Sequence, residues 1–402
     1  MIKPNQGQEF IIEEAVKWYY YGIDQVFQYD GPPGSGKSFV LNEIIKRLGL
    51  DPLYEVAAMS FIGSASLVMR NKGLWSAKTA HSWLFDIEVV TKKDANGNVM
   101  MDTLLNVPIR EPKFVPVSYL DPMIKLIVID EGYSMPFWMR HEVMKFGIKI
   151  LVCGDQNQLP PVNDAPAFLA SGKIYHLTEC MRQAGMDDIN FIANRVNQGL
   201  PLINGYYGNS IVINSKDLSD RMLMWADMII CSRNLTRDAI NERVRSILGY
   251  NNSPLPRQGE KVVCRNNNWL ESVPIGMGME INLVNGLIGR VASNPDISSY
   301  DGELFSMNFI PDLQPNIMFM NSRCNYQHMI SNNATRQAIR ANRYSKGNMF
   351  EFGYCLTTYV AQGSQAHKVI YIEEKTRREI QTCTNLVGAT RADEALIYVK
   401  DY

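Results

Sequence analysis

The sequence predicts an α/β protein built on parallel β-sheets, and three observations lead to this fold class. Residues 27–30 form a short strand that leads through a glycine-rich turn into a helix at residues 39–48 with helical apolar spacing. Residues 125–129 and 148–153 form two further apolar strands, each leading to an acidic residue. In open parallel sheets the polar residues that follow such strands gather at one edge, where ligands bind.

The length of the chain predicts its number of domains, and its net charge excludes a protein that binds polyanions through bulk positive charge. The chain has 402 residues, more than the roughly 250 to 300 at which a single core stops growing, so we expect at least two domains. Its 40 Lys and Arg residues and 41 Asp and Glu residues give a net charge of −1. This balance excludes a protein that binds polyanions through bulk positive charge, so a nucleic-acid site must be a local patch.

The cysteines and the apolar segments indicate the compartment. Seven cysteines lie far apart without a CxxC pair, which is typical of reduced thiols and argues against zinc. No apolar run approaches the roughly 18 residues that span a bilayer, and the N-terminal segment has no apolar signal core. We therefore expect a cytoplasmic protein without a membrane partner.

The glycine-rich turn has the pattern of a phosphate-binding P-loop. Its glycines allow the backbone N–H groups, with the dipole of the following helix behind them, to point at phosphates. Lys37 is expected to reach the β and γ phosphates of ATP, and the hydroxyl of Ser38 to hold Mg²⁺. The predicted cradle consists of Gly31, Pro32, Pro33, Gly34, Ser35, Gly36, Lys37 and Ser38.

Acidic and amide residues at the other two strand ends fit the same chemistry. Asp130 is expected to bind Mg²⁺ directly or through water, and Glu131 to orient or deprotonate the attacking water. Gln158 follows the third strand in Gly154-Asp155-Gln156-Asn157-Gln158. The alternatives are a strand that leaves the core and a surface loop that ends in Pro160-Pro161.

With these motifs the sequence resembles the superfamily 1 helicases, and most closely their B subclass of RecD-like and Dda-like DNA helicases. Beyond the P-loop, Asp130-Glu131 and Gln158, the resemblance depends on the order of seven further motifs along nearly the whole chain. They are Gln6 before a helix, residues 56–65, Thr79-Ala80-His81-Ser82, residues 177–183, residues 259–289 at the entry to an SH3-like insertion, residues 357–364 and Ala389-Thr390-Arg391-Ala392.

The resemblance implies roles for individual residues. Gln6 would read adenine, Arg182 and Arg391 would act as arginine fingers on the phosphates, and Lys37, Asp130, Glu131 and Gln158 would complete the catalytic set. The implied nucleotide contacts also include Gln362, Gly363 and Gln365, and the implied DNA contacts are Ser60, Gly63, His81 and Thr357. For His81, packing or capping is the alternative.

The sequence departs from the family pattern at several of these positions. Gly132-Tyr133 interrupts the usual Asp-Glu-Ala-Ser, and Tyr359 replaces a histidine. Gln365 stands where a ribose-binding Glu is common, but its amide can still hydrogen-bond a ribose hydroxyl.

Two acid-free stretches suggest a path for the nucleic acid. Residues 56–85 contain Arg70, Lys72 and Lys78, and residues 313–350 contain five basic residues. In the second stretch Arg336, Arg340 and Arg343 share one face of a predicted helix. A basic groove with aromatic stacking platforms suits a strand-tracking protein, and a solvated helix face is the alternative.

An insertion before Asp130 predicts a β-hairpin. Two β-prone runs within residues 86–101 are separated by Asn96-Gly97, a signal for a tight turn. In the resembled family a hairpin at this place splits the duplex. A surface hairpin without a role in strand separation is the alternative.

From the resemblance we expect two RecA-like domains with a hairpin insertion in the first and an SH3-like β insertion in the second. The predicted boundaries are residues 1–82 and 123–176 for domain 1A, 83–122 for the hairpin, 177–267 and 336–402 for domain 2A, and 268–335 for the SH3-like insertion.

The function that the resemblance implies is ATP-dependent unwinding of DNA, with translocation 5′ to 3′ along a single strand and Mg²⁺ as cofactor. The implied setting is replication, repair or recombination in a bacteriophage or bacterium, by a monomer working at DNA forks with partners such as a single-strand-binding protein. The alternatives are a superfamily 1 RNA helicase, a 3′ to 5′ DNA helicase, and a non-catalytic P-loop module that binds single strands.

Overall fold

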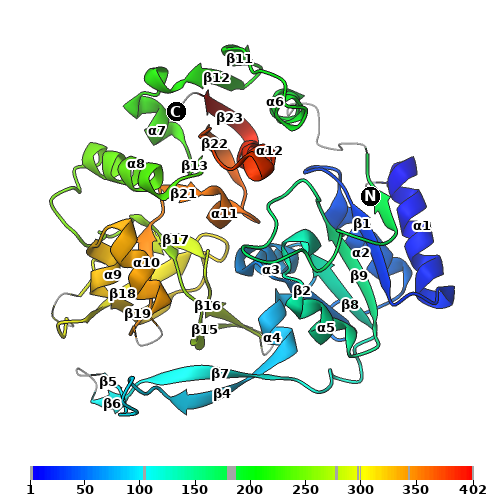
Figure 1. The fold of residues 1–402 in the computed structure, drawn as a ribbon, viewed down its shortest axis with the longest axis horizontal. Coiled ribbons are helices and arrows are strands. Elements are labelled where there is room, and N and C mark those ends of the chain that lie inside the picture. Colours follow the sequence, from blue (N-terminus) through cyan, green and yellow to red (C-terminus); the bar gives the residue numbers. More distant parts are fainter. Residues whose placement is uncertain are drawn as a thin grey trace. The chain divides into compact units, whose positions relative to one another are not determined.

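We analysed a computed structural model of the chain, which describes residues 3–102, 106–178, 187–276, 279–296, 298, 300–342 and 345–400. The chain divides into two compact units (Figure 1). Unit 1 comprises Met1–Asp86, Pro116–Asp217 and Ala361–Tyr402, and unit 2 comprises Ile87–Val115 and Leu218–Val360. Among the described residues, no helix combines the length and the apolar character that a membrane crossing requires.

Unit 1 contains a six-stranded sheet in the order β10-β1-β9-β8-β2-β3, and all of its pairings are parallel. Its strands are β1 (Val26–Asp30), β2 (Val56–Ser60), β3 (Lys78–Thr79), β8 (Leu126–Asp130), β9 (Lys149–Gly154) and β10 (Ile174–His176). Its helices are α1 (Gln6–Tyr21), α2 (Lys37–Arg47), α3 (Gly63–Asn71), α4 (Ala80–Leu84) and α5 (Trp138–Met144). This arrangement confirms the predicted α/β class with a parallel sheet.

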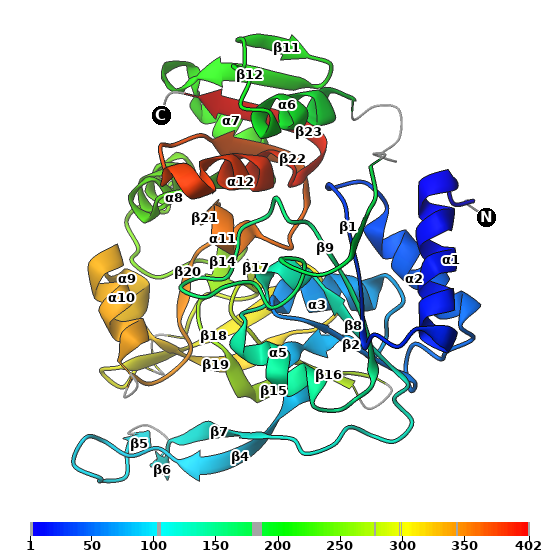
Figure 2. The same cartoon turned by 45° about the vertical axis from the view of Figure 1, so that its right-hand side comes forward.

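Alternation along the strands explains how this sheet is covered. In β8, Leu126 and Val128 belong to one apolar cluster with α1 and α2, whereas Ile127 and Ile129 belong to a second cluster with α4 and α5. Because successive strand residues point to opposite faces, an uninterrupted apolar run is what a sheet covered on both faces needs. Figure 2 shows α1 and α2 side by side.

The other described residues of unit 1 form four more strands and two more helices. β12 (Ser210–Asn214) and β22 (Ala366–Ile372) each pair in parallel with β23 (Ala392–Lys400), and β11 (Gly205–Tyr207) pairs antiparallel with β12. The helices are α6 (Asp187–Asn197) and α12 (Arg378–Ala389), with a 3₁₀ turn at Ser215–Asp217. A Cβ on Gly388 would lie 2.0 Å from Tyr371 Cδ2, so glycine allows α12 to pack directly on β22.

Unit 2 combines a small parallel pair with an antiparallel sheet. β13 (Met228–Cys231) pairs in parallel with β21 (Cys355–Thr357), beside the helices α7 (Asp220–Trp225) and α8 (Asn234–Ile247). The antiparallel sheet has the order β19-β18-β17-β14-β20. Its strands are β14 (Lys261–Cys264), β17 (Ile288–Val291), β18 (Leu304–Pro311), β19 (Phe319–Asn325) and β20 (Phe350–Phe352). A hairpin of β15 (Asn268–Gly276) and β16 (Met279–Leu283), and the helices α9 (Tyr326–Ile330) and α10 (Asn333–Ala341), complete the unit.

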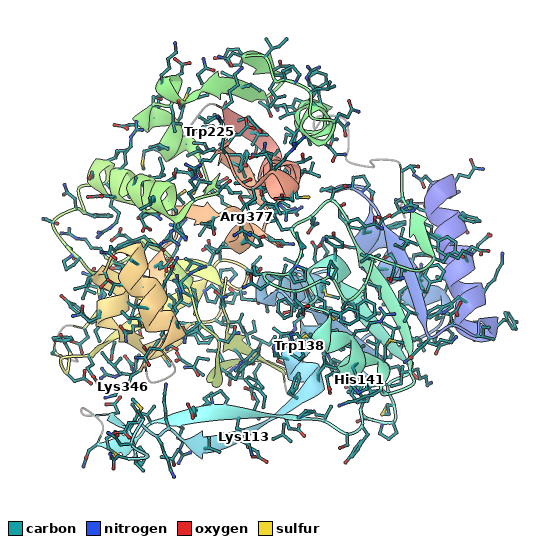
Figure 3. The ribbon with its side chains drawn as sticks, in the orientation of Figure 1. Lys113, Trp138, His141, Trp225, Lys346 and Arg377 are labelled. Atoms are coloured by element: carbon teal, nitrogen blue, oxygen red, sulfur yellow. The ribbon has the colours of Figure 1, made fainter. Side chains whose placement is uncertain are left out.

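The predicted hairpin differs from the structure in its pairing. The turn is present, with Gly97 at a φ of 85° and a bridge between Lys93 and Val99. However, β4 (Phe85–Thr91) pairs with β7 (Arg110–Pro116), while β5 (Met101–Asp102) pairs with β6 (Val107–Pro108). The second β-prone run is therefore not the main partner of the first: it contributes only the two-residue strand β5, whereas the more distant β7 has seven residues. Figure 3 shows Lys113 on β7, where its ammonium pairs with Glu88 of β4 at 2.8 Å.

The hairpin has contacts with the antiparallel region of unit 2. Lys92 Nζ donates to the Ser345 carbonyl at 2.6 Å, and the Phe114 and Trp269 rings meet edge to face at 5.9 Å. The two units therefore differ from the domains predicted from the sequence. The hairpin residues 87–115 fall in unit 2, and residues 361–402 fall in unit 1. The domain division predicted from the sequence stays a prediction.

Candidate active site

A cavity of about 600 Å³ in unit 1 gathers most of the predicted nucleotide residues. Sixteen residues line it: Pro33, Gly34, Gly36, Lys37, Ser38, Phe39, Asn42, Ala65, Val68, Lys72, Asp130, Glu131, Gln158, Gly363, Gln365 and Arg391. Its volume lies within the roughly 300 to 1,000 Å³ typical of small-molecule sites. The P-loop, the two acidic residues and Arg391 therefore face one space.

The P-loop backbone explains why glycines occupy two of its positions. Gly34 and Gly36 have φ angles of 85° and 84°, in the left-handed region that side chains disfavour. Gly36 is also the N-cap of α2, so the free N–H groups of this helix end face the cavity. Lys37 Nζ donates to the Gly31 carbonyl at 2.7 Å, which holds the ammonium against the loop.

Gln8, rather than Gln6, is the glutamine that touches the P-loop. Gln6 is exposed and does not line the cavity, whereas Gln8 is buried. The Gln8 amide donates to the Ser35 carbonyl at 3.0 Å and accepts from the Asn5 backbone at 3.1 Å in a capping box. The spacing of Asn5 and Gln8 is that of a capping box, so the sequence predicts the helix cap. It does not predict that Gln8 contacts the P-loop.

Glu131 adopts a strained backbone at the end of β8. Its φ of 54° and ψ of 41° are left-handed, a conformation that non-glycine residues keep mainly where function requires it. Next to it, a Cβ on Gly132 would lie 2.4 Å from Val152 Cγ1, so a side chain at this position would clash with β9.

The electrostatics of Glu131 suit a proton acceptor. Burial raises the pKa of this carboxyl, the charge of Asp130 raises it further, and Lys37 and Arg391 oppose the shift. Gln158 Nε2 donates to Glu131 Oε1 at 3.4 Å, which orients the carboxylate. A base whose pKa lies nearer to neutrality takes a proton from water more effectively.

Asp155 is an acidic residue to which the sequence analysis gave no role. It is buried, and its Oδ2 atom has no hydrogen-bond partner among the described residues. Burial raises the pKa of Asp155, and the charges of Lys37 and Arg391 lower it. Asp155 therefore interacts electrostatically with the same two cations as Glu131 does.

Of the two predicted arginine fingers, Arg391 lies at the cavity and Arg182 lies outside the described residues. Arg391 is buried, and its guanidinium donates to the Val387 carbonyl at 3.1 Å and to the Ser364 carbonyl at 3.3 Å. These contacts hold the positive charge in place before any substrate binds. Gln365 and Gly363 also line the cavity, whereas Gln362 contacts Gln158 instead.

The residues present fit a magnesium nucleotide. Ser38 supplies a hydroxyl and Asp130 a carboxylate, the hard oxygen ligands that Mg²⁺ prefers. Mg²⁺ is commonly bound by one or two protein oxygens together with phosphates. In the part of the chain that the structure describes, no group of three or more His, Cys, Asp or Glu residues is arranged to hold a metal ion.

The predicted DNA contacts of unit 1 lie at the end of β2 and in the helices α3 and α4, which follow β2 and β3. Ser60 is fully buried at the end of β2, and Gly63 begins α3. His81 has ring neighbours in Phe61 at 5.8 Å, Phe85 at 5.9 Å and Trp138 at 6.1 Å, with Trp138 at the start of α5 (Figure 3). Burial lowers the pKa of His81, so at neutral pH the ring is uncharged and suits packing or stacking better than phosphate binding.

The basic helix face of unit 2 points inward. Arg336 is buried, and its guanidinium contacts Asp238 at 3.2 Å and the His328 carbonyl at 3.1 Å. Arg340 pairs with the buried carboxylate of Glu351. Arg343 lies outside the described residues, and Thr357 is buried at the end of β21. The two described arginines therefore form ion pairs within unit 2. Neither of the two interpretations from the sequence, a DNA-binding face and a solvated helix face, included this pairing.

Comparisons with known proteins give the family. A family model described as an AAA domain matches residues 5–209, slightly more than half of the chain. The chain belongs to the AAA domain family. No curated protein matches the chain.

Solved structures with a similar fold include Pif1 helicases. The Pif1 helicase of Candida albicans has a TM-score of 0.51 and 15% identity, covering 100% of this chain and 96% of that one. Bacteroides Pif1 bound to ssDNA has a TM-score of 0.53 and 14% identity, covering 99% and 92%. Bacteroides Pif1 with ADP-AlF3 and ssDNA has a TM-score of 0.52 and 15% identity, with the same coverage of 99% and 92%.

These likenesses confirm the predicted fold class along nearly the full length of the chain.

Proposed function

We propose that this protein is an ATP-dependent DNA helicase that moves 5′ to 3′ along single-stranded DNA and unwinds duplex. The observation that carries the proposal is the cavity that joins the P-loop, the Asp130-Glu131 pair, Gln158 and Arg391. Of the described site residues, these are the ones that phosphoryl transfer to water requires. The DNA-bound Pif1 structures with this fold support DNA as the partner.

We propose roles for six residues that line the cavity. Lys37 and the N–H groups at the start of α2 bind the phosphates, and Ser38 and Asp130 provide oxygen ligands for Mg²⁺, which neutralises phosphate charge when bound. Glu131, oriented by Gln158, accepts the proton of the attacking water. Arg391 stabilises the negative charge that develops on the transferred phosphoryl group.

The coupling of hydrolysis to movement requires a link between the catalytic carboxylate and segments that respond to DNA. Gln158 touches Glu131 on one side and Gln362 on the other. Gln362 lies in the motif that, in the resembled helicases, contacts both DNA and nucleotide. In this proposal a displacement of Gln362 is transmitted to Glu131, and the reverse, through the two hydrogen bonds of Gln158.

The decisive experiment measures strand displacement from duplexes with a 5′ or a 3′ single-stranded tail, made of DNA or RNA, with and without ATP. We expect ATP-dependent displacement only from the 5′-tailed DNA substrate. The matched control is Lys37→Ala, which should remove ATP hydrolysis and displacement together. Displacement from 3′ tails would favour the opposite polarity, RNA substrates an RNA helicase, and full cellular activity of Lys37→Ala a non-catalytic binding module.

The hairpin of residues 85–116 is proposed as the element that separates the strands. Shortening residues 92–100 should abolish unwinding and leave ATPase stimulation by single-stranded DNA largely intact. Equal loss of both activities would refute this role.

The resemblance to Dda-like helicases also leads us to propose a cellular setting. We place the protein in the cytoplasm of a bacterium, or of a phage-infected host, as a monomer that acts in replication, repair or recombination. A single-strand-binding protein is the proposed partner, and co-sedimentation with that protein on forked DNA tests both the partner and the monomeric state.

A further inference from the structure

Lys72 lies at the nucleotide cavity rather than on a surface track. It is the C-cap of α3, and it lines the same cavity as Lys37 and Arg391. Its Nζ atom lies 3.2 Å from the hydroxyl oxygen of Ser38, the proposed Mg²⁺ ligand. In the sequence this lysine belongs to the acid-free stretch of the predicted DNA path, and nothing local shows the direction in which α3 ends.

The backbone of Lys72 is fixed, while its side chain is exposed. Asn42 of α2, one turn beyond Ser38, donates its side-chain amide to the Lys72 carbonyl at 2.9 Å. The Lys72 N–H donates to the Val68 carbonyl at 3.1 Å and so closes the last turn of α3. Residues of both helices line the cavity. The Lys72 ammonium therefore lies beside the start of α2, at the end of a flexible four-carbon side chain.

Electrostatics indicate what this ammonium binds. A lysine beside Ser38 is repelled by a divalent cation at that hydroxyl, but is attracted by the oxygens of a polyphosphate chain. A triphosphate carries more negative charge and reaches further along the loop than a diphosphate does. An ammonium with three donors is suited to such oxygens, and its exposed stem lets it shift from Ser38 onto them.

We propose that Lys72 is a phosphate-binding residue that makes the cavity prefer nucleoside triphosphates over diphosphates. The proposal rests on the proposed function, since it assigns a specificity-determining contact to the same ATP site. It adds a third cation, supplied by α3, to the Lys37 and Arg391 pair.

The test is equilibrium binding of fluorescent ADP and of a fluorescent non-hydrolysable ATP analogue to the full chain, in the presence of Mg²⁺. Lys72→Met should weaken binding of the triphosphate about tenfold and of the diphosphate less than about threefold, and Lys72→Arg should restore most of the preference. The control is Lys46→Met, because Lys46 lies on α2 outside the cavity and pairs with Glu43.

The outcomes separate the two proposals. Equal affinities of wild type and Lys72→Met for the triphosphate, or an equal loss for both nucleotides, would overturn the role of Lys72. A wild-type chain that binds neither nucleotide would overturn the proposed function itself. Thermal melting of each variant shows that it is folded, and Lys72→Gln replaces Lys72→Met if the latter does not fold.

Discussion

The side-chain amide of Gln362 donates a hydrogen bond to Oε1 of Gln158 at 3.2 Å, and both residues are buried. Gln158 uses its own amide nitrogen to contact Glu131 at 3.4 Å. Each glutamine therefore has a fixed orientation, with the Gln158 oxygen facing Gln362 and its nitrogen facing the carboxylate. A rotation of Gln158 would break both hydrogen bonds, so the position of Glu131 depends on a residue 231 positions away in the sequence.

We predict that Gln362→Ala slows steady-state ATP hydrolysis about tenfold, because a buried acceptor on Gln158 loses its partner at a cost of about 1 to 3 kcal/mol. Nucleotide affinity should change less than about threefold, since Gln362 does not line the cavity. A double-mutant cycle with Gln158→Ala measures the coupling. Strictly additive effects of the two substitutions on turnover would argue against the link.

Glu131, the proposed proton acceptor, also carries a cost in stability. We predict that Glu131→Gln loses ATP hydrolysis by orders of magnitude while still binding nucleotide, because glutamine cannot accept the proton. The same substitution should raise the free energy of unfolding by about 0.5 to 2 kcal/mol at neutral pH, because glutamine carries no charge and so removes the cost of the buried carboxylate beside Asp130. Nucleotide binding, turnover and denaturant unfolding of one protein preparation measure the three effects.

The stability gain of Glu131→Gln should depend on pH in a defined direction. Burial and Asp130 raise the pKa of Glu131 in the folded chain above its ordinary value of 4.5. The folded state therefore favours the protonated carboxyl, and the penalty for its charge is complete only above the folded pKa. We expect the difference between variant and wild type to shrink as the pH falls toward 4.5. A difference that grows on acidification would contradict this.

The local motifs of the active site were predictable from the sequence because their geometry is local. The P-loop needs left-handed glycines at positions 34 and 36 and a helix directly after them, and each requirement is visible in adjacent residues. The same holds for an apolar strand that ends in Asp130. The contacts of Gln8 and Lys72 could not be predicted, because each depends on how a separate helix, α1 or α3, packs beside the loop.

The arginines of α10 show a second limit of sequence patterns. Their spacing identifies a common helix face, but not the direction in which that face points. In the structure Asp238 and Glu351, from distant elements, supply carboxylates to this face, and that of Glu351 is buried. Although burial raises the pKa of Glu351, the charges of Arg265, Arg237 and Arg340 hold it below the ordinary range. Such pairing across distant segments is invisible in a helical pattern.

The glycine after Glu131 should be intolerant of alanine. A Cβ on Gly132 would lie 2.4 Å from Val152 Cγ1 of β9, inside the sheet core, where neither side can move freely. We predict that Gly132→Ala lowers the free energy of unfolding by about 1 to 3 kcal/mol, the range for overpacking. Val152→Ala removes the clashing methyl group, so the double variant should be more stable than the sum of the two single changes predicts. Strict additivity would show that the contact is relieved elsewhere.

The ring pair of Phe114 and Trp269 should orient the hairpin for unwinding. The two rings meet at 5.9 Å and 89°, a geometry worth about 0.5 to 1.5 kcal/mol beyond the buried area. We predict that Phe114→Ala reduces the rate of duplex unwinding severalfold, while ATPase stimulation by single-stranded DNA stays near the wild-type level. Val89→Ala is the control, because Val89 lies exposed on the paired strand β4 of the same hairpin. If Phe114→Ala unwinds as fast as Val89→Ala, the ring pair does not position the hairpin, and if its ATPase activity falls in parallel, its effect is not specific to strand separation.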